Sequence, residues 1–210
     1  MSKDKTLKKA AKKVVKTDHE VTHAVSAARE TLPVRIAGLL AEVGDQPELI
    51  TASAGTLVVG LVSRRPDLIR GGARMLTAHL VATGVKTMIK HRLDRHRPAA
   101  AEESGDHHFR KGASHDHDEN SFPSGHTAGA VAVARAASRD IEGAGTPAGL
   151  AATAIAAAQP ATGSHFLSDV VAGAAVGWVS EAVVSAIFDR VEPRIEDALR
   201  RVRSRSEGAA

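Results

Sequence analysis

The sequence predicts an all-α fold, a bundle of about five to six helices, and three observations support this. No alternation of polar and apolar residues runs long enough to indicate a β-strand. Stretches rich in Ala, Val, Leu and Ile are separated by Gly and Pro, which mark helix ends. Only 2% of residues are aromatic, Tyr is absent, and there are 18 Gly, a composition that suits helices packed closely through small side chains.

The length of 210 residues suits one domain with a substantial core. There is no Cys, which excludes disulfides and thiolate chemistry. The start of the chain is lysine-rich without a following apolar segment, so no signal peptide is expected.

Residues 1–18 form a predicted N-terminal arm that is rich in lysine. Its lysines are Lys3, Lys5, Lys8, Lys9, Lys12, Lys13 and Lys16. Such an arm either contacts an anionic membrane surface or is a solvated tail. No aromatic residues lie between the lysines to stack on bases, so no nucleic-acid partner is expected.

Residues 19–192 form the predicted bundle, followed by a basic C-terminal tail over 193–210. The expected helices are 21–43 (interrupted near Pro33), 47–63, 68–90, 126–139, 148–158 and 165–190. The second can begin at Pro47, because proline is tolerated in a first helical turn, and it ends at the Arg64–Pro66 segment.

The polar segment 99–120 is too long for a tight turn, and we expect a functional or mobile loop there. The fourth helix ends at the Gly and Pro residues of 143–147. The fifth is expected to stop at Pro160 and Gly163, and Pro193 is expected to end the sixth.

Hydropathy leaves a membrane bundle and a soluble bundle both open. A spanning helix needs about 20 mostly apolar residues, and the mean hydropathy of −0.13 is low for a protein with several spans. Charges interrupt the helical segments at Arg74, Lys86, Arg135 and Glu181. Such charges are tolerated in a membrane only where they face the interior of the bundle.

The segment Ser121–His126 has the features of a helix N-terminus that binds an anion. Pro123 suits the start of a helix, and Ser124 can cap the first free amides. Gly125 lets a ligand approach the backbone, and His126 follows on the first turn. Free amides, a hydroxyl and an imidazole suit an oxyanion such as phosphate. The alternative is an ordinary helix start with an incidental histidine.

Two further clusters contain residues that suit phosphate chemistry. At the end of the third helix, a short basic segment separates Lys90 from Arg97 and Pro98. Lys offers a point charge and Arg a planar fork for phosphate oxygens, although basic residues are also common at helix C-termini. Further on, His165 and Asp169 are four residues apart, so they would share a face of a helix. The carboxylate could then orient the imidazole, or the two could be an ordinary polar pair.

In this order, Lys-x6-Arg-Pro, Pro-Ser-Gly-His and His-x3-Asp resemble the motifs of the type 2 phosphatidic acid phosphatase superfamily, which includes vanadium haloperoxidases. The resemblance spans about Lys90 to Asp169, and the helical pattern extends it over about 47–190. It implies a helical bundle with the active site at one end. It also implies that no metal or other cofactor is needed, because lysine and arginine supply the charge.

The resemblance also implies a role for each residue. His165 would be the nucleophile, Asp169 would orient it, and His126 would protonate the leaving oxygen and later activate water. The phosphate oxygens would be bound by Lys90, Arg97, Ser124 and the Gly125 amide.

One position departs from the family pattern. An Arg normally lies six residues before the nucleophilic His, and this chain has Gln159 there. The loss of one charge-assisted contact to a transition-state oxyanion costs about 2–4 kcal/mol. Arg92, Arg95 and Arg110 are candidates to compensate.

The loop between the first two motifs is rich in His and Asp, which also suit a transition metal. The residues are His107, His108, His115, His117, Asp106, Asp116 and Asp118. A solvated loop at the pocket mouth with a role in substrate choice is the simpler reading, and no metal is expected.

In the lipid-phosphatase branch of the family, the three motifs lie on one side of the membrane. The predicted helices fit that arrangement, with both basic termini on the opposite side as the positive-inside rule prefers. This implies a bacterial-type inner-membrane location, multi-pass or tightly associated, with a soluble protein as the alternative.

The leading functional hypothesis is a phosphatase that hydrolyses a phosphate monoester, of a lipid or another organic molecule, through a phosphohistidine. The first alternative is an impaired relative that binds anionic lipids, which Gln159 motivates. A vanadate-dependent haloperoxidase is a further alternative, disfavoured by the short chain and the few aromatics. The sequence leaves the oligomeric state open.

Overall fold

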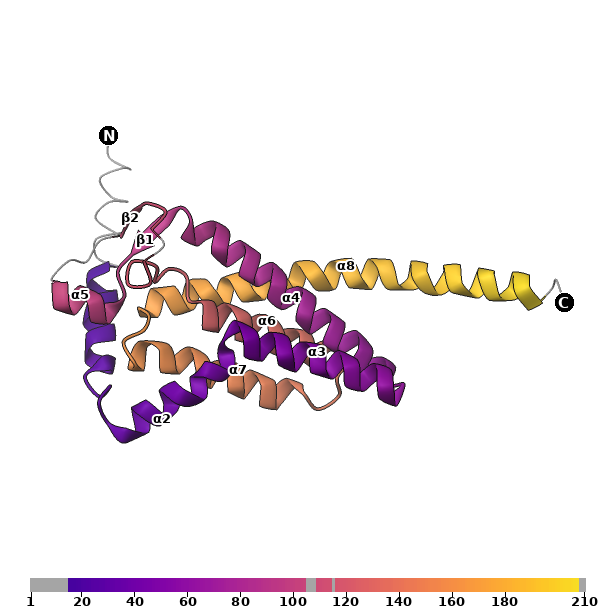
Figure 1. Ribbon diagram of the computed structural model, residues 1–210, viewed down its shortest axis with the longest axis horizontal. Coiled ribbons are helices and arrows are strands. Elements are labelled where there is room, and N and C mark those ends of the chain that lie inside the picture. The colour runs from indigo at the N-terminus through magenta and orange to yellow at the C-terminus, as the bar shows by residue number, and fades with distance from the viewer. Residues whose placement is uncertain (1–14, 105–108, 115, 208–210) are drawn as a thin grey trace.

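The computed structural model describes residues 15–104, 109–114 and 116–207. The fold is all-α, as predicted, and the helices form an elongated bundle with one small two-stranded sheet at its end (Figure 1). The helices are α2 (Leu32–Ala41), α3 (Gln46–Ser63), α4 (Pro66–Lys90), α5 (Pro98–Ser104), α6 (Gly125–Asp140), α7 (Gly145–Ala161) and α8 (Leu167–Glu207). A 3-10 turn, η1 (Glu42–Gly44), links α2 to α3, and residues 15–26 are also helical.

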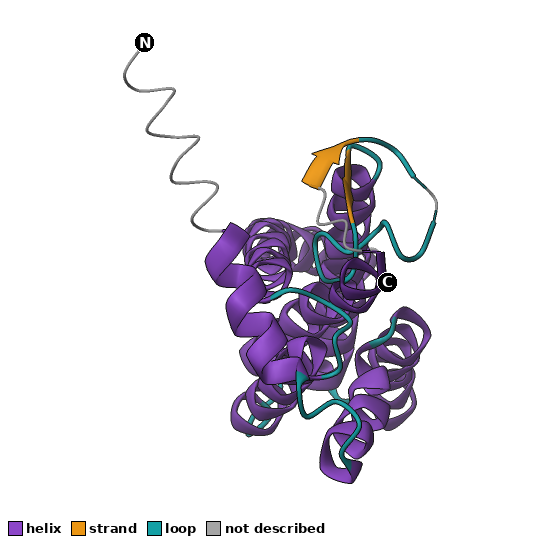
Figure 2. Ribbon diagram, turned by 90° about the vertical axis from the view of Figure 1, so that its left-hand side faces the viewer, coloured by secondary structure: helices purple, strands orange, loops and turns teal. Residues whose placement is uncertain are grey.

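Helices α4, α6 and α8 pack on one another, with α3 against α4 and α7 against α6 (Figure 1). Figure 2 shows the bundle from the end that carries the two strands. The core between the central helices is built largely from alanine. Ala78, Ala82, Ala132 and Ala136 are completely buried. The scarcity of aromatic residues is therefore matched by close helix packing, as the composition predicts.

Helix α8 approaches α6 closely because it has glycine at two positions one turn apart. A β-carbon at Gly173 would lie 2.5 Å from the carbonyl oxygen of Ser124, and one at Gly177 would lie 2.3 Å from that of Ala128. Both distances are shorter than a β-carbon tolerates, so the two backbones can touch only through glycine. This contact brings the start of α8 beside the start of α6.

The ends of α4 and α7 and the beginnings of α6 and α8 lie at one end of the bundle, as the predicted topology requires (Figure 1). The N-terminal part does not follow the prediction. The expected helix 21–43 is divided into the helical segment 15–26 and α2, and Pro33 lies in the first turn of α2 instead of interrupting a longer helix. Proline is favoured there because the first amides of a helix have no intrahelical partner.

Segment 15–26 lies at the same end of the bundle, where Asp18 forms an ion pair with Arg95. The prediction that the N-terminal side lies at the opposite end is therefore wrong for the part of the chain that the structure describes. Most of the predicted arm, residues 1–14, lies outside the described residues, and the boundary predicted at residue 18 falls inside a helix.

Two prolines predicted to break helices lie within them. Helix α7 continues through Pro160 to Ala161, and α8 continues through Pro193 to Glu207. A proline removes one backbone hydrogen bond, and the neighbouring bonds can keep the helix continuous. The boundary predicted at residue 192 therefore falls inside α8, which extends well beyond the bundle (Figure 1).

The segment predicted as a loop over 99–120 contains α5 and one strand. Strands β1 (Leu93–Arg95) and β2 (Phe109–Lys111) pair antiparallel, with Asp94 opposite Arg110. Strands of three residues are too short to show an alternating pattern, so sequence periodicity missed them.

The charges within the predicted helices face the bundle. Arg74 is 1% exposed and binds Asp140 at 2.7 Å and Asp189 at 3.1 Å. Glu181 is fully buried and binds Arg135 and Arg139 on α6.

Candidate active site

The start of α6 is built as the sequence predicts. Ser124 is the N-cap, and its side chain accepts a hydrogen bond from the amide of Thr127 at 3.4 Å. The Phe122–Pro123 peptide bond just before it is cis. As the first two residues of the helix, Gly125 and His126 have amides without an intrahelical partner. Both residues line a pocket of about 320 Å³, so the positive end of the helix points into it.

Five of the seven residues predicted for the site line this pocket. They are Lys90, Arg97, Gly125, His126 and His165. Lys90 donates to the carbonyl oxygen of Asn120 at 2.6 Å, and Arg97 donates to the carbonyls of His117 and Ser164, each at 3.0 Å. The two basic side chains are thus held at the pocket wall by the backbone of the motifs that follow them.

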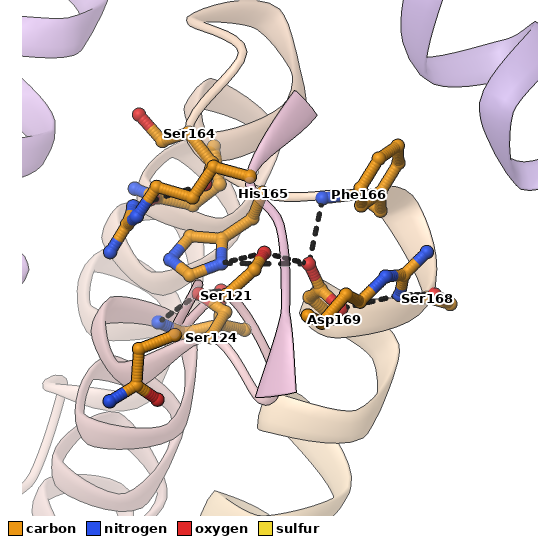
Figure 3. A network of polar contacts seen from close by, with 12 residues as sticks. Ser121, Ser124, Ser164, His165, Phe166, Ser168 and Asp169 are labelled. Atoms are coloured by element: carbon orange, nitrogen blue, oxygen red, sulfur yellow. Dashed lines mark hydrogen bonds and ion pairs between the residues drawn. The ribbon is translucent and has the colours of Figure 1, made fainter. Parts of the chain in front are cut away.

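His165 lies in the turn before α8, not on the helix as predicted. Its Nδ1 is 3.7 Å from Oδ2 of Asp169 in the first turn of α8. That separation is longer than a direct hydrogen bond. The hydroxyl of Ser121 lies beside both groups, 3.4 Å from Nδ1 and 2.5 Å from Oδ2 (Figure 3). The predicted pair therefore forms, with a serine joining it.

Asp169 does not line the pocket and is fully buried behind His165. Its Oδ2 also accepts from the amide of Phe166 at 2.9 Å, and its Oδ1 accepts from Arg95 at 2.6 Å (Figure 3). Arg95 in turn donates to Asp18 at 2.6 Å. Every oxygen of Asp169 has a partner, which fixes the carboxylate that faces the imidazole.

Asp18 connects the N-terminal helical segment to the start of α8. Its two carboxylate oxygens accept from the amide of Ser168 at 2.9 Å and from the Ser168 hydroxyl at 2.5 Å. Thr22, one turn later, accepts from the amide of Leu167 at 3.3 Å. The segment 15–26 therefore caps α8 at the point where the site is built.

His126 has a carboxylate partner that the sequence did not reveal. Its Nε2 lies 2.8 Å from Oδ1 of Asp45, the residue that precedes α3. Asp45 also lines the pocket. The two histidines thus have different surroundings: His165 is 1% exposed, whereas His126 is accessible and has an exposed carboxylate beside it.

Burial and positive charge keep both histidines neutral at neutral pH. Burial lowers the pKa of His165 to about 4, and the charges of Arg97 and Lys90 act in the same direction. Burial also lowers the pKa of His126, against the opposing effect of Asp45. For Lys90, burial and then the charge of Arg97 lower the pKa to about 8. A neutral imidazole has a free lone pair, which a nucleophile requires.

Two predicted details differ from the structure. Ser124 is completely buried and does not line the pocket, because its hydroxyl is engaged with Thr127. Arg95 is bound to two carboxylates, and neither it nor Arg92 nor Arg110 lines the pocket. None of the three therefore lies where it could replace a missing phosphate ligand directly.

Gln159 lies at the edge of a second, adjoining groove of about 540 Å³. Its amide donates to the carbonyl oxygen of Ile155 at 3.2 Å. The groove runs between α2 and the end of α7, and it shares Asp45, Arg97, His117 and His126 with the first pocket. His126 thus stands where the two spaces meet.

The His-rich loop reaches the site through His117, which lines both spaces. Asp106, His107, His108 and His115 lie outside the described residues. Among the residues that are described, no group of three His, Asp or Glu side chains is arranged to hold a metal ion.

Sequence reasoning missed five residues that complete the site: Asp18, Asp45, Lys86, Arg95 and Ser121. Ser121 opens the central motif, so its position beside the histidine could have been considered. Lys86 precedes Lys90 by one helical turn, which places both on one face of α4. Asp18 and Asp45 come from segments with no local signal. Arg95 lies inside the basic Lys90–Pro98 segment, where the sequence suggests only a substitute phosphate ligand.

Comparisons with known proteins found solved structures with a similar fold. The crystal structure of Aquifex aeolicus LpxE matches with a TM-score of 0.56 and 22% identity over 80% of this chain and 93% of that one. The first transmembrane PAP2 type phosphatidylglycerolphosphate phosphatase from Bacillus subtilis matches with a TM-score of 0.61 and 18% identity, over 85% and 87% of the two chains. At these identities the likeness concerns the fold. No curated protein sequence matches the chain.

The family model described as the PAP2 superfamily matches residues 71–192, which is more than half of the chain and includes all three motifs. The resemblance of the motifs is thereby confirmed, and the protein belongs to the PAP2 superfamily.

Proposed function

We propose that this protein is a phosphatase that hydrolyses a phosphate monoester through a phosphohistidine at His165. The observation that carries the proposal is the pocket in which a neutral, buried imidazole faces two basic side chains and the start of α6. Membership of the PAP2 superfamily supports the same reaction. So does the similar fold of the Bacillus subtilis protein, a phosphatidylglycerolphosphate phosphatase.

In the first step, the free Nε2 of His165 attacks phosphorus and the bond to the leaving oxygen breaks. Nδ1 faces Ser121 and Asp169, so the carboxylate stabilises the positive charge that develops on the ring. Lys90, Arg97 and the α6 amides bind the three equatorial oxygens. Protonated His126 gives its proton to the leaving oxygen.

The charge of the substrate favours that protonation. The cations of the pocket lower the pKa of His126 in the free protein, after the larger effect of burial. A bound phosphate dianion offsets those cations, so the pKa of His126 rises when substrate is present. In the second step, His126 removes a proton from water, and the hydroxide attacks phosphorus, breaking the P–N bond to His165 and releasing inorganic phosphate.

We propose a phosphorylated lipid as the substrate and a membrane as the location. Within the described residues, one segment, Leu167–Val191, is long and apolar enough to cross a membrane, and 39% of its most apolar window is buried. Its exposed residues include the apolar Trp178, Val179 and Ile187. Helix α3 exposes a similar face. Exposed apolar surface of this extent marks a contact with a membrane or a partner.

The reaction is tested by phosphate release from a lipid phosphate and from a soluble monoester, with the His165→Ala variant as the control. Wild-type turnover should exceed that of the variant by several orders of magnitude. With 32P-labelled substrate, the wild type should also yield protein-bound label that survives alkali and is lost in acid, as expected for phosphohistidine. Equal rates in the two proteins would refute the proposal.

The location is tested separately by fractionating cells that express the protein. Retention in the membrane fraction after washing with high salt and carbonate is the expected result. Release by either wash would instead indicate a peripheral or soluble protein.

A further inference from the structure

We propose that Lys86 is a phosphate-binding residue of this pocket and supplies the positive charge that position 159 lacks. The inference rests on the proposed function, because it concerns the same pocket. Lys86 lies on α4 one turn before Lys90, so the two side chains emerge from the same face of the helix. Both line the pocket.

Within the described residues, all the donors of the Lys86 ammonium group are available to a ligand, whereas Lys90 and Arg97 keep only part of theirs. Lys90 and Arg97 each donate to backbone carbonyls. In the described part of the chain, Lys86 has no such hydrogen bond and no ion pair, although Asp45 is near enough to influence it electrostatically. An ammonium group has three donors, and a partly buried one without partners is costly. A bound anion would satisfy it.

Lys86 is also directed at the place where an anion would sit. A β-carbon built on Gly125 would lie 3.0 Å from Cδ of Lys86 and 3.2 Å from its Nζ. The ammonium group therefore lies beside the first residue of α6, where the free amides form the positive end of the helix. The ammonium group and the positive end of the helix repel each other, and an anion bound between them would remove that repulsion.

The number of cations in the pocket relates Lys86 to Gln159. The basic side chains that line the pocket, among the described residues, are Lys86, Lys90 and Arg97. Gln159 is uncharged and its amide is directed at the carbonyl of Ile155, away from any phosphate role. A third cation from α4 gives the pocket the charge that an arginine at 159 would bring.

The test compares wild type with Lys86→Met, which keeps the length of the side chain and removes its charge. The value of kcat/KM for a phosphate monoester should fall by about 10- to 100-fold. Lys111→Met, at an exposed lysine outside the pocket, is the matched control and should behave as wild type. Thermal unfolding of both variants verifies that they fold.

A second measurement does not depend on turnover. Inorganic phosphate binding, measured by calorimetry, should weaken by about tenfold or more in Lys86→Met and not in Lys111→Met. If wild type binds phosphate but is inactive on every monoester, the proposed phosphatase function fails while the binding role of Lys86 stands. Unchanged phosphate binding and unchanged kcat/KM in folded Lys86→Met would overturn the inference.

The relation to position 159 is tested by adding Gln159→Arg to Lys86→Met. The double variant should regain about tenfold in kcat/KM over Lys86→Met, because it restores the number of cations. A double variant no more active than Lys86→Met would contradict the exchange of roles between the two positions.

Discussion

Arg95 binds Oδ1 of Asp169 at 2.6 Å while the other oxygen of that carboxylate faces His165. The guanidinium also binds Asp18 from the N-terminal helical segment. Both carboxylates and the arginine are more than nine-tenths buried. Asp169, which we propose orients His165, is therefore itself held by buried ion pairs that include a distant part of the chain.

The Asp18→Asn substitution tests this connection. It replaces the ionised acceptor of Arg95 and of the Ser168 hydroxyl with a neutral amide, so these charge-assisted hydrogen bonds weaken and the free energy of unfolding should fall by about 3 kcal/mol. If Asp18 positions the site through Arg95, kcat should fall about tenfold with little change in KM. Glu20→Gln, at an exposed position two residues later, is the control for both measurements. Loss of stability with unchanged kcat would assign Asp18 a structural role alone.

Removal of the Ser121 hydroxyl should impair the alignment of the catalytic pair. In Ser121→Ala, Asp169 loses its 2.5 Å hydrogen bond, and Nδ1 of His165 loses the hydroxyl that lies 3.4 Å from it. We expect kcat to fall by about tenfold, as for loss of a single group that orients a catalytic residue. The control is Ser138→Ala, an exposed serine further along α6. A kcat equal to that of wild type would remove Ser121 from the mechanism.

The stability of the protein should depend on pH through His165. Its pKa of about 4 in the folded protein lies below the value of about 6.5 expected in the unfolded chain. As pH falls, the unfolded chain binds the proton first, so stability is complete above about pH 6.5 and declines toward pH 4. The loss should approach about 3 kcal/mol, measured as the shift of the thermal or denaturant midpoint. His165→Asn should flatten this part of the profile; an unaltered profile would show that another group causes it.

The alkaline limb of the activity profile should report on Lys90. Burial lowers its pKa to about 8, so the free protein loses this charge above pH 8 and kcat/KM should decline there. Lys90→Arg keeps the charge at higher pH, and the limb should move upward by more than one pH unit while the rate at pH 7 falls moderately. Lys111→Arg should leave the limb in place. If the limb is the same in all three proteins, a different group controls it.

The glycine contact between α6 and α8 should be intolerant of even one methyl group. In Gly173→Ala the new β-carbon would lie 2.5 Å from the carbonyl oxygen of Ser124, so α8 must shift, at a cost of about 1–3 kcal/mol. Because Ser124 and Asp169 are joined by a 3.0 Å backbone hydrogen bond at that place, kcat should fall as well. Gly149→Ala in α7 meets nothing within 4 Å and should be neutral or stabilising. Equal stability of the two variants would contradict this account.

The convergence of the three motifs could be predicted from sequence because each lies at a helix end and their order fixes the topology. Local chemistry also predicted Ser124 as the cap of α6. The partners of the catalytic pair could not be predicted in the same way. Asp18 and Arg95 are 77 residues apart, and only the folded bundle brings them together. Pro160 misled the prediction because its cost is one hydrogen bond, which the packed end of α7 tolerates.

The glycines at 173 and 177 also determine what can vary in this site. The separation between His165 and the α6 amides that we propose bind phosphate is constrained where backbone touches backbone, at glycines that do not line the pocket. Charged groups at the wall, on α4 or at the end of α7, can therefore be exchanged in evolution without altering that separation. A protein that lost the arginine at position 159 would keep the separation between His165 and the α6 amides, while a cation on another helix supplied the charge.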